Sequence, residues 1–172
     1  MTTSIHITAL DAIVNVNSLF TVAVFIGLAW TGNPTDPNNT LVVDPACSAT
    51  PKIAEDLISF HVYSFSSFLF SSLIALALKQ ALRITRNPEF HPSELFARVN
   101  KRLFRVGMLV SGAGSAFGCG FLMMALVDMV QIKLGTLACG SGHSFAAVVP
   151  LVILVPIALL SYVCVVLYAF TR

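Results

Sequence analysis

The sequence contains little charge. Asp, Glu, Lys and Arg make up only 10% of its 172 residues, against roughly 25% in an ordinary soluble domain. Apolar residues account for 56% of the chain, and the mean hydropathy is +0.85. A soluble domain of this length cannot bury so much apolar surface, which excludes an aqueous globular enzyme. Because the net charge is only +2, a disordered chain and a nucleic-acid-binding module are excluded as well.

The sequence also lacks the short motifs of metal and nucleotide chemistry. It has no CxxC, HExxH, P-loop or GxGxxG pattern. The histidines, His6, His61, His91 and His143, are scattered, and no pair has the spacing of metal ligands. A haem-ligand or pH-sensing role is open for His61, but a hydrogen bond between helices is the simpler interpretation. We therefore expect no enzyme activity, no cofactor and no tightly bound metal.

The charges that are present avoid four long stretches. Residues 12–30, 57–78, 106–127 and 144–171 contain no Asp, Glu, Lys or Arg and are 19, 22, 22 and 28 residues long. A helix needs about 20 residues to cross a bilayer, and buried helices of a soluble protein would show polar faces that are missing here. The sequence predicts an all-α integral membrane protein with one transmembrane domain over 1–172. The expected helices span about 11–30, 52–80, 93–130 and 145–170.

Lysine and arginine predict the orientation in the membrane. Seven of the ten lie between the second and third expected helices, whereas Lys52 and Lys133 stand in the other two gaps. Because cytoplasmic loops collect positive charge, we expect segment 79–105 in the cytoplasm together with both termini (N-in/C-in). Binding of anionic lipid headgroups is one interpretation of this segment, and an ordinary positively charged flank is the simpler one. No basic n-region precedes the first helix, so we expect a retained anchor rather than a cleaved signal peptide.

The first and third loops are then expected on the lumenal or outer side. Asn38 begins an Asn-Asn-Thr sequon for N-glycosylation in the first loop. Cys47 in the first loop and Cys139 in the third would both meet an oxidising compartment. We predict a disulfide between them, with two free thiols as the alternative.

The second expected helix carries a polar stripe. At about 100° per residue, half of its circumference holds two carboxylates and most of its hydroxyls. These residues are Glu55, Asp56, Ser59, Tyr63, Ser64, Ser66, Ser67 and Ser71. Lipid cannot solvate such a row, so it faces either other helices or water. Hydrogen bonds between helices would account for two or three serines, whereas five serines capped by two carboxylates favour a water-lined pathway.

Four helices with one polar face cannot enclose such a pathway alone, so we expect a symmetric homo-oligomer around a central pore. The residues predicted to line this pore are Glu55, Asp56, Ser59, Tyr63, Ser66, Ser67 and, from the first helix, Asn15. Phe60 and Phe70 lie within the polar arc and are candidates for a hydrophobic constriction. Rings of carboxylates at the lumenal mouth would concentrate cations, and their hard oxygen atoms suit Ca²⁺. The expected permeant ions are Ca²⁺ and monovalent cations.

Several polar and small residues have a structural interpretation. For Asn15 and Asn17, a contact between helices of one protomer stays an open alternative. Asp128 at the end of the third helix either joins an acidic mouth or is solvated. The small residues of this helix repeat at four-residue steps and predict a face for close helix packing. They are Gly107, Ser111 and Ser115, and then Gly114 and Gly118.

Two segments resemble a known family. They are 9–34, ALDAIVNVNSLFTVAVFIGLAWTGNP, and 54–84, AEDLISFHVYSFSSFLFSSLIALALKQALRI. They are similar to a plant-specific family of small four-span membrane proteins, the WeiTsing-type cation channels of the endoplasmic reticulum. The resemblance covers the chain from the first helix onward and rests on overall pattern rather than on a short motif. It implies a pentamer around a central pore, permeable to calcium and acting in plant immune signalling.

Other interpretations of four membrane helices stay open. In a tetraspan scaffold, comparable in topology to claudin-like or Casparian-strip-like proteins, the serines would join protomers and the first loop would meet a partner. An accessory subunit of a larger transporter is a third interpretation. The plasma membrane is the alternative to the endoplasmic reticulum.

Overall fold

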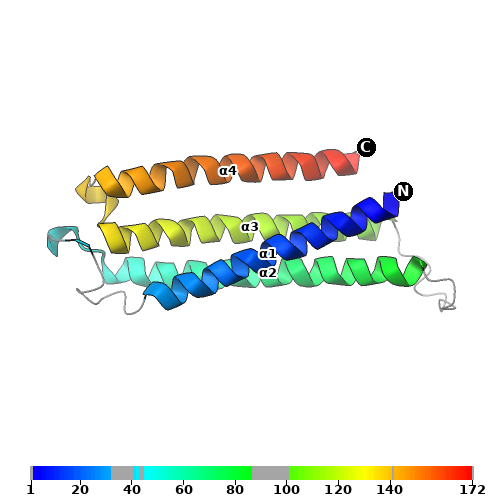
Figure 1. The fold of residues 1–172 in the computed structure, drawn as a ribbon, viewed down its shortest axis with the longest axis horizontal. Coiled ribbons are helices and arrows are strands. Elements are labelled where there is room, and N and C mark those ends of the chain that lie inside the picture. The colour runs from blue at the N-terminus through cyan, green and yellow to red at the C-terminus, as the bar shows by residue number, and fades with distance from the viewer. Residues whose placement is uncertain (1, 32–40, 43–44, 87–100, 141, 172) are drawn as a thin grey trace.

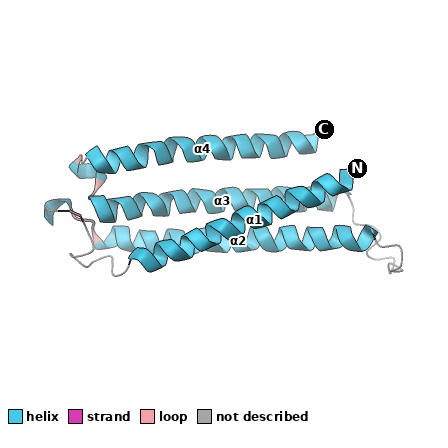
Figure 2. Cartoon of the chain, viewed as in Figure 1, coloured by secondary structure: helices cyan, strands magenta, loops and turns pink. Residues whose placement is uncertain are grey.

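The computed structural model describes residues 2–31, 41–42, 45–86, 101–140 and 142–171. Four long helices occupy most of this length (Figure 1). They are α1 (Thr2–Thr31), α2 (Pro51–Arg86), α3 (Lys101–Leu134) and α4 (Gly142–Thr171). Two short 3₁₀ helices, η2 (Pro45–Cys47) and η3 (Leu137–Cys139), lie in the connections. The described residues contain no strand (Figure 2).

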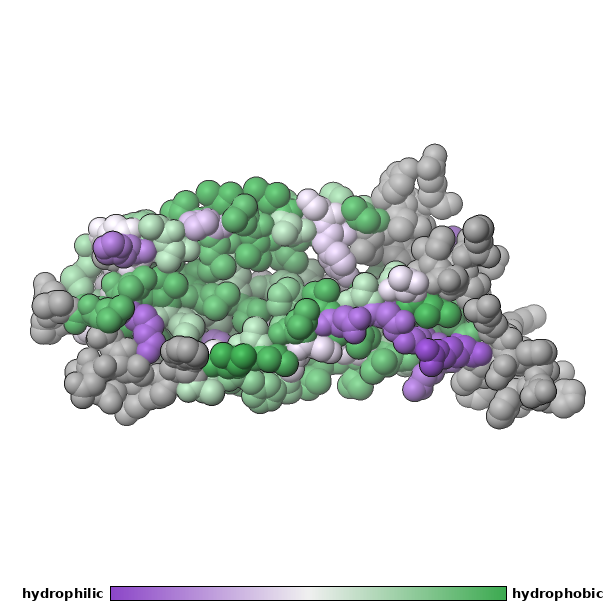
Figure 3. All heavy atoms as spheres, in the orientation of Figure 1, coloured by the Kyte–Doolittle hydropathy of each residue, from purple (hydrophilic) through white to green (hydrophobic). Residues whose placement is uncertain are grey.

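Each long helix contains a segment that is long and apolar enough to cross a membrane. These segments are Ile7–Ala29, Pro51–Arg83, Phe104–Leu134 and Gly142–Val165. On the face shown in Figure 3, the middle of the molecule is mostly hydrophobic. Hydrophilic residues gather toward the two ends, and one hydrophilic strip reaches inward over α1 and α2 (Figure 3). The predicted all-α fold with four membrane helices is confirmed, and the protein is an integral membrane protein.

All four helices extend beyond their predicted bounds. α2 continues past residue 80 to Arg86, and α4 begins at Gly142 rather than at residue 145. α1 begins at Thr2 rather than near residue 11, because residues 2–10 contain no glycine or proline and Leu10 is buried against α2 and α3. α3 continues past residue 130 and ends at Leu134. The next residue, Gly135, has a φ of +98°, a backbone conformation that favours glycine. The predicted start of the third helix near residue 93 lies outside the described residues, as does the sequon.

The antiparallel helices α2 and α3 form the central pair (Figure 1). α1 crosses α2 obliquely and contacts both of them, α4 contacts α3, and both ends of the chain lie at the same end of the molecule (Figure 1). Small residues allow α3 to approach α2 closely. A Cβ atom on Gly118 would lie 2.6 Å from the ring of Phe68, and one on Gly107 would lie 2.9 Å from Leu78. Ser111 is fully buried in the same contact, so the predicted packing face of α3 is confirmed.

Buried apolar side chains form three clusters along the central pair. The first holds Leu10, Ile13, Ala75 and Met108, the second holds Val24, Phe68 and Leu122, and the third holds Ala54, Leu57, Ala125 and Ile132. α1 contributes to the first two clusters, while the third joins α2 and α3 alone. These contacts fix which side of α2 faces inward.

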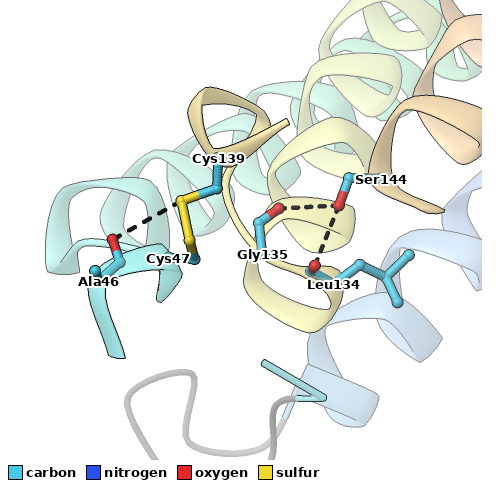
Figure 4. The surroundings of a disulfide bond; sticks show 6 residues. All are labelled: Ala46, Cys47, Leu134, Gly135, Cys139 and Ser144. Carbon is cyan, nitrogen blue, oxygen red and sulfur yellow. Dashed lines mark hydrogen bonds between the residues drawn. A yellow bond between two sulfur atoms is a disulfide. The ribbon is translucent and has the colours of Figure 1, made fainter. Parts of the chain in front are cut away.

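At the end of the molecule opposite the two chain termini, a disulfide and hydrogen bonds join the connections between the helices (Figure 4). Cys47 and Cys139 form a disulfide with their Cα atoms 5.7 Å apart, which confirms the predicted pair. The backbone N–H of Thr136 donates to the carbonyl of Cys47 at 3.1 Å. At the start of α4, Ser144 Oγ lies 3.2 and 3.1 Å from two carbonyl oxygens at the end of α3. The first connection is therefore bound to the third.

Candidate functional site

The polar stripe of α2 divides into an inner and an outer set. Ser64 and Ser71 form the inner set and have no solvent-exposed surface. Ser59, Ser66 and Ser67 belong to the outer set and keep part or much of their surface accessible. The stripe covers half of the circumference of α2, but α3 contacts only one edge of the stripe. The serines at that edge are therefore buried, and the others are not.

The inner set meets Asn17 of α1 at the centre of the three-helix contact. The amide Nδ2 of Asn17 donates to Ser71 Oγ at 2.9 Å and to Ser72 Oγ at 3.2 Å. Its Oδ1 accepts a hydrogen bond from Ser115 Oγ at 2.7 Å. Both hydrogen atoms of the amide group and its oxygen are thereby used. Asn17 is only 1% exposed, so the contact between helices that sequence left open is the correct interpretation for this residue.

Ser71 extends the network to α3. Its hydroxyl donates to the carbonyl of Ser111 at 2.7 Å, and the hydroxyl of Ser111 donates to the carbonyl of Ser71 at 2.9 Å. Nearer the disulfide, Ser64 Oγ donates to the carbonyl of Gly118 at 2.9 Å. The prediction that the whole stripe meets water is therefore wrong for Ser64 and Ser71. Their hydroxyls bond to α3, whose small residues allow the two backbones to approach each other.

The outer hydroxyls bond to their own helix. Ser59 donates to the carbonyl of Glu55 at 3.0 Å, and Ser66 and Ser67 donate to carbonyls one turn earlier at 2.8 Å. A serine that bonds in this way has satisfied its donor without water or a partner helix. The number of serines is therefore not in itself a sign of an aqueous pathway. Contact with water is indicated instead by the other side chains on the same outward face of α2.

Those groups form a line on the outward face of α2, which we call the outer stripe: Glu55, Ser59, Tyr63, Ser66 and Phe70. Glu55 and Ser66 are exposed, and Tyr63 and Phe70 are each 53% exposed. Steps of three and four residues keep all five on one side of the helix. The outer stripe begins with a carboxylate, continues with hydroxyls and ends with an aromatic ring.

Three further predicted site residues lie beside the outer stripe, toward α3. Asp56 and Ser67 are partly buried. Phe60 is partly buried too, and its ring centroid lies 6.3 Å from that of Phe121. Tyr63 contacts the same ring at 5.5 Å. The structure thus brings the predicted site residues of α2 together on one surface of the α2–α3 pair. Each of them is exposed or only partly buried.

Asp128 of α3 is a further acidic group on this side. It is 8% exposed and interacts electrostatically with Asp56. Oδ1 accepts a hydrogen bond from Gln131 at 3.3 Å, while Oδ2 has no hydrogen-bond partner among the described residues. Of the two predictions for Asp128, full solvation is wrong, because its side chain is buried. A carboxylate buried beside another carboxylate is stabilised either by protonation or by a nearby cation.

Asn15, the predicted site residue of α1, lies apart from this surface. It is two residues from Asn17, so the two side chains point about 160° apart around the helix. Asn15 is exposed, and its side chain makes no hydrogen bond within the described residues. The structure does not bring it into contact with the outer stripe.

Two polar residues have roles that the sequence did not reveal. His61 is buried, and its Nδ1 donates to the carbonyl of Leu57 at 2.8 Å, within α2 rather than between helices. Lys79 forms an ion pair with Asp11 and so joins α2 to α1. The opposite charges at one expected membrane surface were the available signal for this pair. In the described part of the chain, no three His, Cys, Asp or Glu side chains are grouped to hold a metal ion.

Comparisons with protein-family models, with curated proteins and with solved structures find no match to this chain. The family resemblance therefore stays a prediction. The features of the protein that bear on its function are the outer stripe, the buried network and the arrangement of charge.

Proposed function

We propose that this chain is one subunit of a homo-oligomeric, calcium-permeable cation channel, with the outer stripe of α2 as the pore wall. The carrying observation is that Glu55, Ser59, Tyr63 and Ser66 are accessible along one line of α2. A pentamer in the endoplasmic reticulum that acts in plant immune signalling is the form that the family resemblance implies.

The interior of one protomer offers no route for ions. Asn17, Ser71 and Ser111 are fully buried and bonded to one another, and apolar clusters lie on both sides of them. Opening a path there would break this network and leave buried polar groups without partners, which is costly. A pathway therefore has to run between copies, with the outward face of each α2 turned to a common axis.

The charges of this surface suit a cation. Glu55 and Asp56 lie at the end of α2 near the disulfide, and Asp128 is beside Asp56. Five copies would bring ten carboxylates of Glu55 and Asp56 to one mouth, where they raise the local cation concentration. Carboxylate oxygens are also the ligands that Ca²⁺ prefers.

Phe70 is the better placed of the two predicted constriction residues. It follows Ser66 on the outer stripe and is 53% exposed, whereas Phe60 packs against Phe121. A ring of phenyl groups beyond a hydroxyl-lined section narrows a pore and opposes its hydration. The proposed pore therefore runs from an acidic mouth through a polar section to an apolar gate.

The acidic mouth is tested by planar-bilayer recording of the purified full chain. Glu55→Gln combined with Asp56→Asn is expected to lower cation conductance at low salt about tenfold, with a smaller effect at 1 M salt, where charges are screened. The charge-conserving pair Glu55→Asp and Asp56→Glu is the control and should keep cation selectivity. Unchanged conductance and selectivity in the neutral variant would contradict the proposed mouth.

One observation favours the scaffold as the second candidate. Because Ser59, Ser66 and Ser67 bond to their own helix, the outer stripe also tolerates a dry contact with a neighbouring helix. Ser66→Cys, made without Cys119 and Cys164, separates the two functions. A water-filled pore predicts rapid reaction with a charged methanethiosulfonate reagent. Ser161 of α4, which is also exposed and bonded to its own helix, supplies the matched Ser161→Cys control, and equally slow reaction at both sites would favour the scaffold.

A further inference from the structure

Two carboxylates meet between α2 and α3 at the disulfide end of the protomer. Asp56 of α2 is partly buried, and Asp128 of α3 is only 8% exposed. Their neighbours along the two helices, Leu57, Ala125 and Ile132, belong to one buried cluster, so the carboxylates lie at the same level of the helix pair. They also interact electrostatically. Two negative charges are therefore held together inside one protomer.

The protomer leaves the charge of Asp128 without a positive partner. Oδ1 accepts one hydrogen bond, from Gln131 at 3.3 Å, and the buried Oδ2 has no hydrogen-bond partner in the described part of the chain. Lys52, one turn before Asp56, is exposed and forms no ion pair with either carboxylate among the described residues. Burying a charge without a partner is costly. A positive ion between the two carboxylates would remove this cost.

The side chains around the two carboxylates offer oxygen atoms on one side and aromatic rings on the other. Phe60, one turn further into α2 than Asp56, packs with its ring centroid 6.3 Å from that of Phe121, on the side of the membrane interior. Gln131 lies on the opposite side, near the end of α3. Its amide nitrogen is used in the hydrogen bond to Asp128, and its amide oxygen makes no hydrogen bond. Carboxylate and amide oxygens are the ligands that Ca²⁺ prefers.

We infer that each protomer binds one Ca²⁺ ion between α2 and α3, held by Asp56 and Oδ2 of Asp128, with the amide oxygen of Gln131 and water completing the coordination. A proton fits less well, because it would neutralise Asp128 alone and turn Oδ2 into a donor that itself needs an acceptor. Oxygen ligands without cysteine or histidine favour Ca²⁺ over soft transition metals. Only two of the ligands are charged, so the site is weak, with a Kd of about 0.1 to 1 mM. It lies within one protomer and does not require the proposed channel.

The experiment measures Ca²⁺ binding to the full chain in uncharged detergent micelles, by equilibrium dialysis at constant ionic strength and at a dilution where the protein is monomeric. The wild type is expected to bind one ion per chain. Asp128→Asn and Asp56→Asn should each weaken binding at least about tenfold, because each removes a charged ligand. Glu55→Gln is the matched control, since it removes the same charge from the adjacent, exposed residue. Its Kd should stay within about threefold of the wild-type value.

Equilibrium unfolding in the same micelles provides a second measurement. An ion that binds only the folded protein raises the ratio of folded to unfolded chains, about elevenfold at a concentration ten times its Kd. In a chelator, Asp128→Asn should be at least as stable as the wild type, because the amide has the shape of the carboxylate without its charge. Ca²⁺ should then stabilise the wild type and leave Asp128→Asn unchanged. An equal response of both proteins overturns the inference, as does a wild type that Ca²⁺ stabilises no more than choline chloride of the same ionic strength.

Failure of this site and failure of the proposed channel are distinguishable, because the binding assay uses the monomer and records no current. If the monomer binds Ca²⁺ and Asp128→Asn does not, the site is established even when the assembled protein does not conduct. If the wild type conducts and its monomer binds no Ca²⁺ up to 10 mM, about ten times the highest expected Kd, the site is refuted while the channel stands.

Discussion

Replacing Asn17 with alanine should destabilise the protomer more than any other single polar truncation in α1. The side chain makes three hydrogen bonds, to Ser71, Ser72 and Ser115, at 2.9, 3.2 and 2.7 Å. Hydrogen bonds between membrane helices average about 0.6 kcal/mol and reach about 1.7 kcal/mol each, so the three together contribute about 2 to 5 kcal/mol. The lower end applies here, because Ser115 retains a contact with Ser71 Oγ at 3.0 Å. We expect a loss of about 2 to 3 kcal/mol in the free energy of unfolding.

The assay is equilibrium unfolding in mixed micelles, at a dilution where the protein is monomeric, followed by the fluorescence of its single tryptophan. Asn15→Ala is the control, since it removes an identical side chain that makes no bond within the protomer. It should change the free energy of unfolding by less than about 0.5 kcal/mol. A double-mutant cycle of Asn17→Ala with Ser71→Ala should give a coupling of about 0.6 kcal/mol or more. Equal losses for Asn15→Ala and Asn17→Ala would refute the buried network.

Two further predictions concern the close packing of α2 with α3 and the disulfide. Gly118→Ala should lower the free energy of unfolding by about 1 to 3 kcal/mol, because its Cβ would lie 2.6 Å from the buried ring of Phe68. Gly120→Ala, whose Cβ meets nothing within 4 Å, should be neutral or stabilising, and the opposite ranking in the same assay would contradict the predicted contact. Replacing Cys47 and Cys139 together with serine should cost about 2 kcal/mol or more. A reducing agent should reproduce that loss in the wild type and leave the double variant unchanged.

The four helices and the disulfide were predictable because they follow from the distribution of charge. Stretches without Asp, Glu, Lys or Arg are long enough to span a bilayer, and Cys47 and Cys139 fall in two connections on one expected side of it. A bilayer keeps charged residues out of the membrane-spanning segments of any sequence. These features therefore do not depend on which helices contact one another. Helix ends were less predictable, because α1 begins well before its uncharged stretch and lacks a breaker there.

The inner and outer faces of α2 were not predictable, because periodicity gives the angles between residues but not the direction of a neighbour. Ser66 and Ser71 both belong to the polar half of the helix, yet one is exposed and the other fully buried. The available signal was on another helix. Ser111 and Ser115 repeat at a four-residue step, and small residues in such a row predict where a second backbone approaches. Combining both rows would have placed Ser71 inside.

The separation of these faces has a consequence for any function of the protein. Polar groups inside the protomer, such as those of Asn17 and Ser71, are used up in bonds to one another. Glu55 and Tyr63 on α2 and Asn15 on α1 are among the groups left for ions or partners, and all three are exposed. Changes in the inner set should therefore alter stability at constant subunit number. Changes to the Glu55 carboxylate, the Asn15 amide and the Tyr63 hydroxyl should alter assembly or conduction at constant stability, because these polar groups make no hydrogen bond within the described part of the protomer.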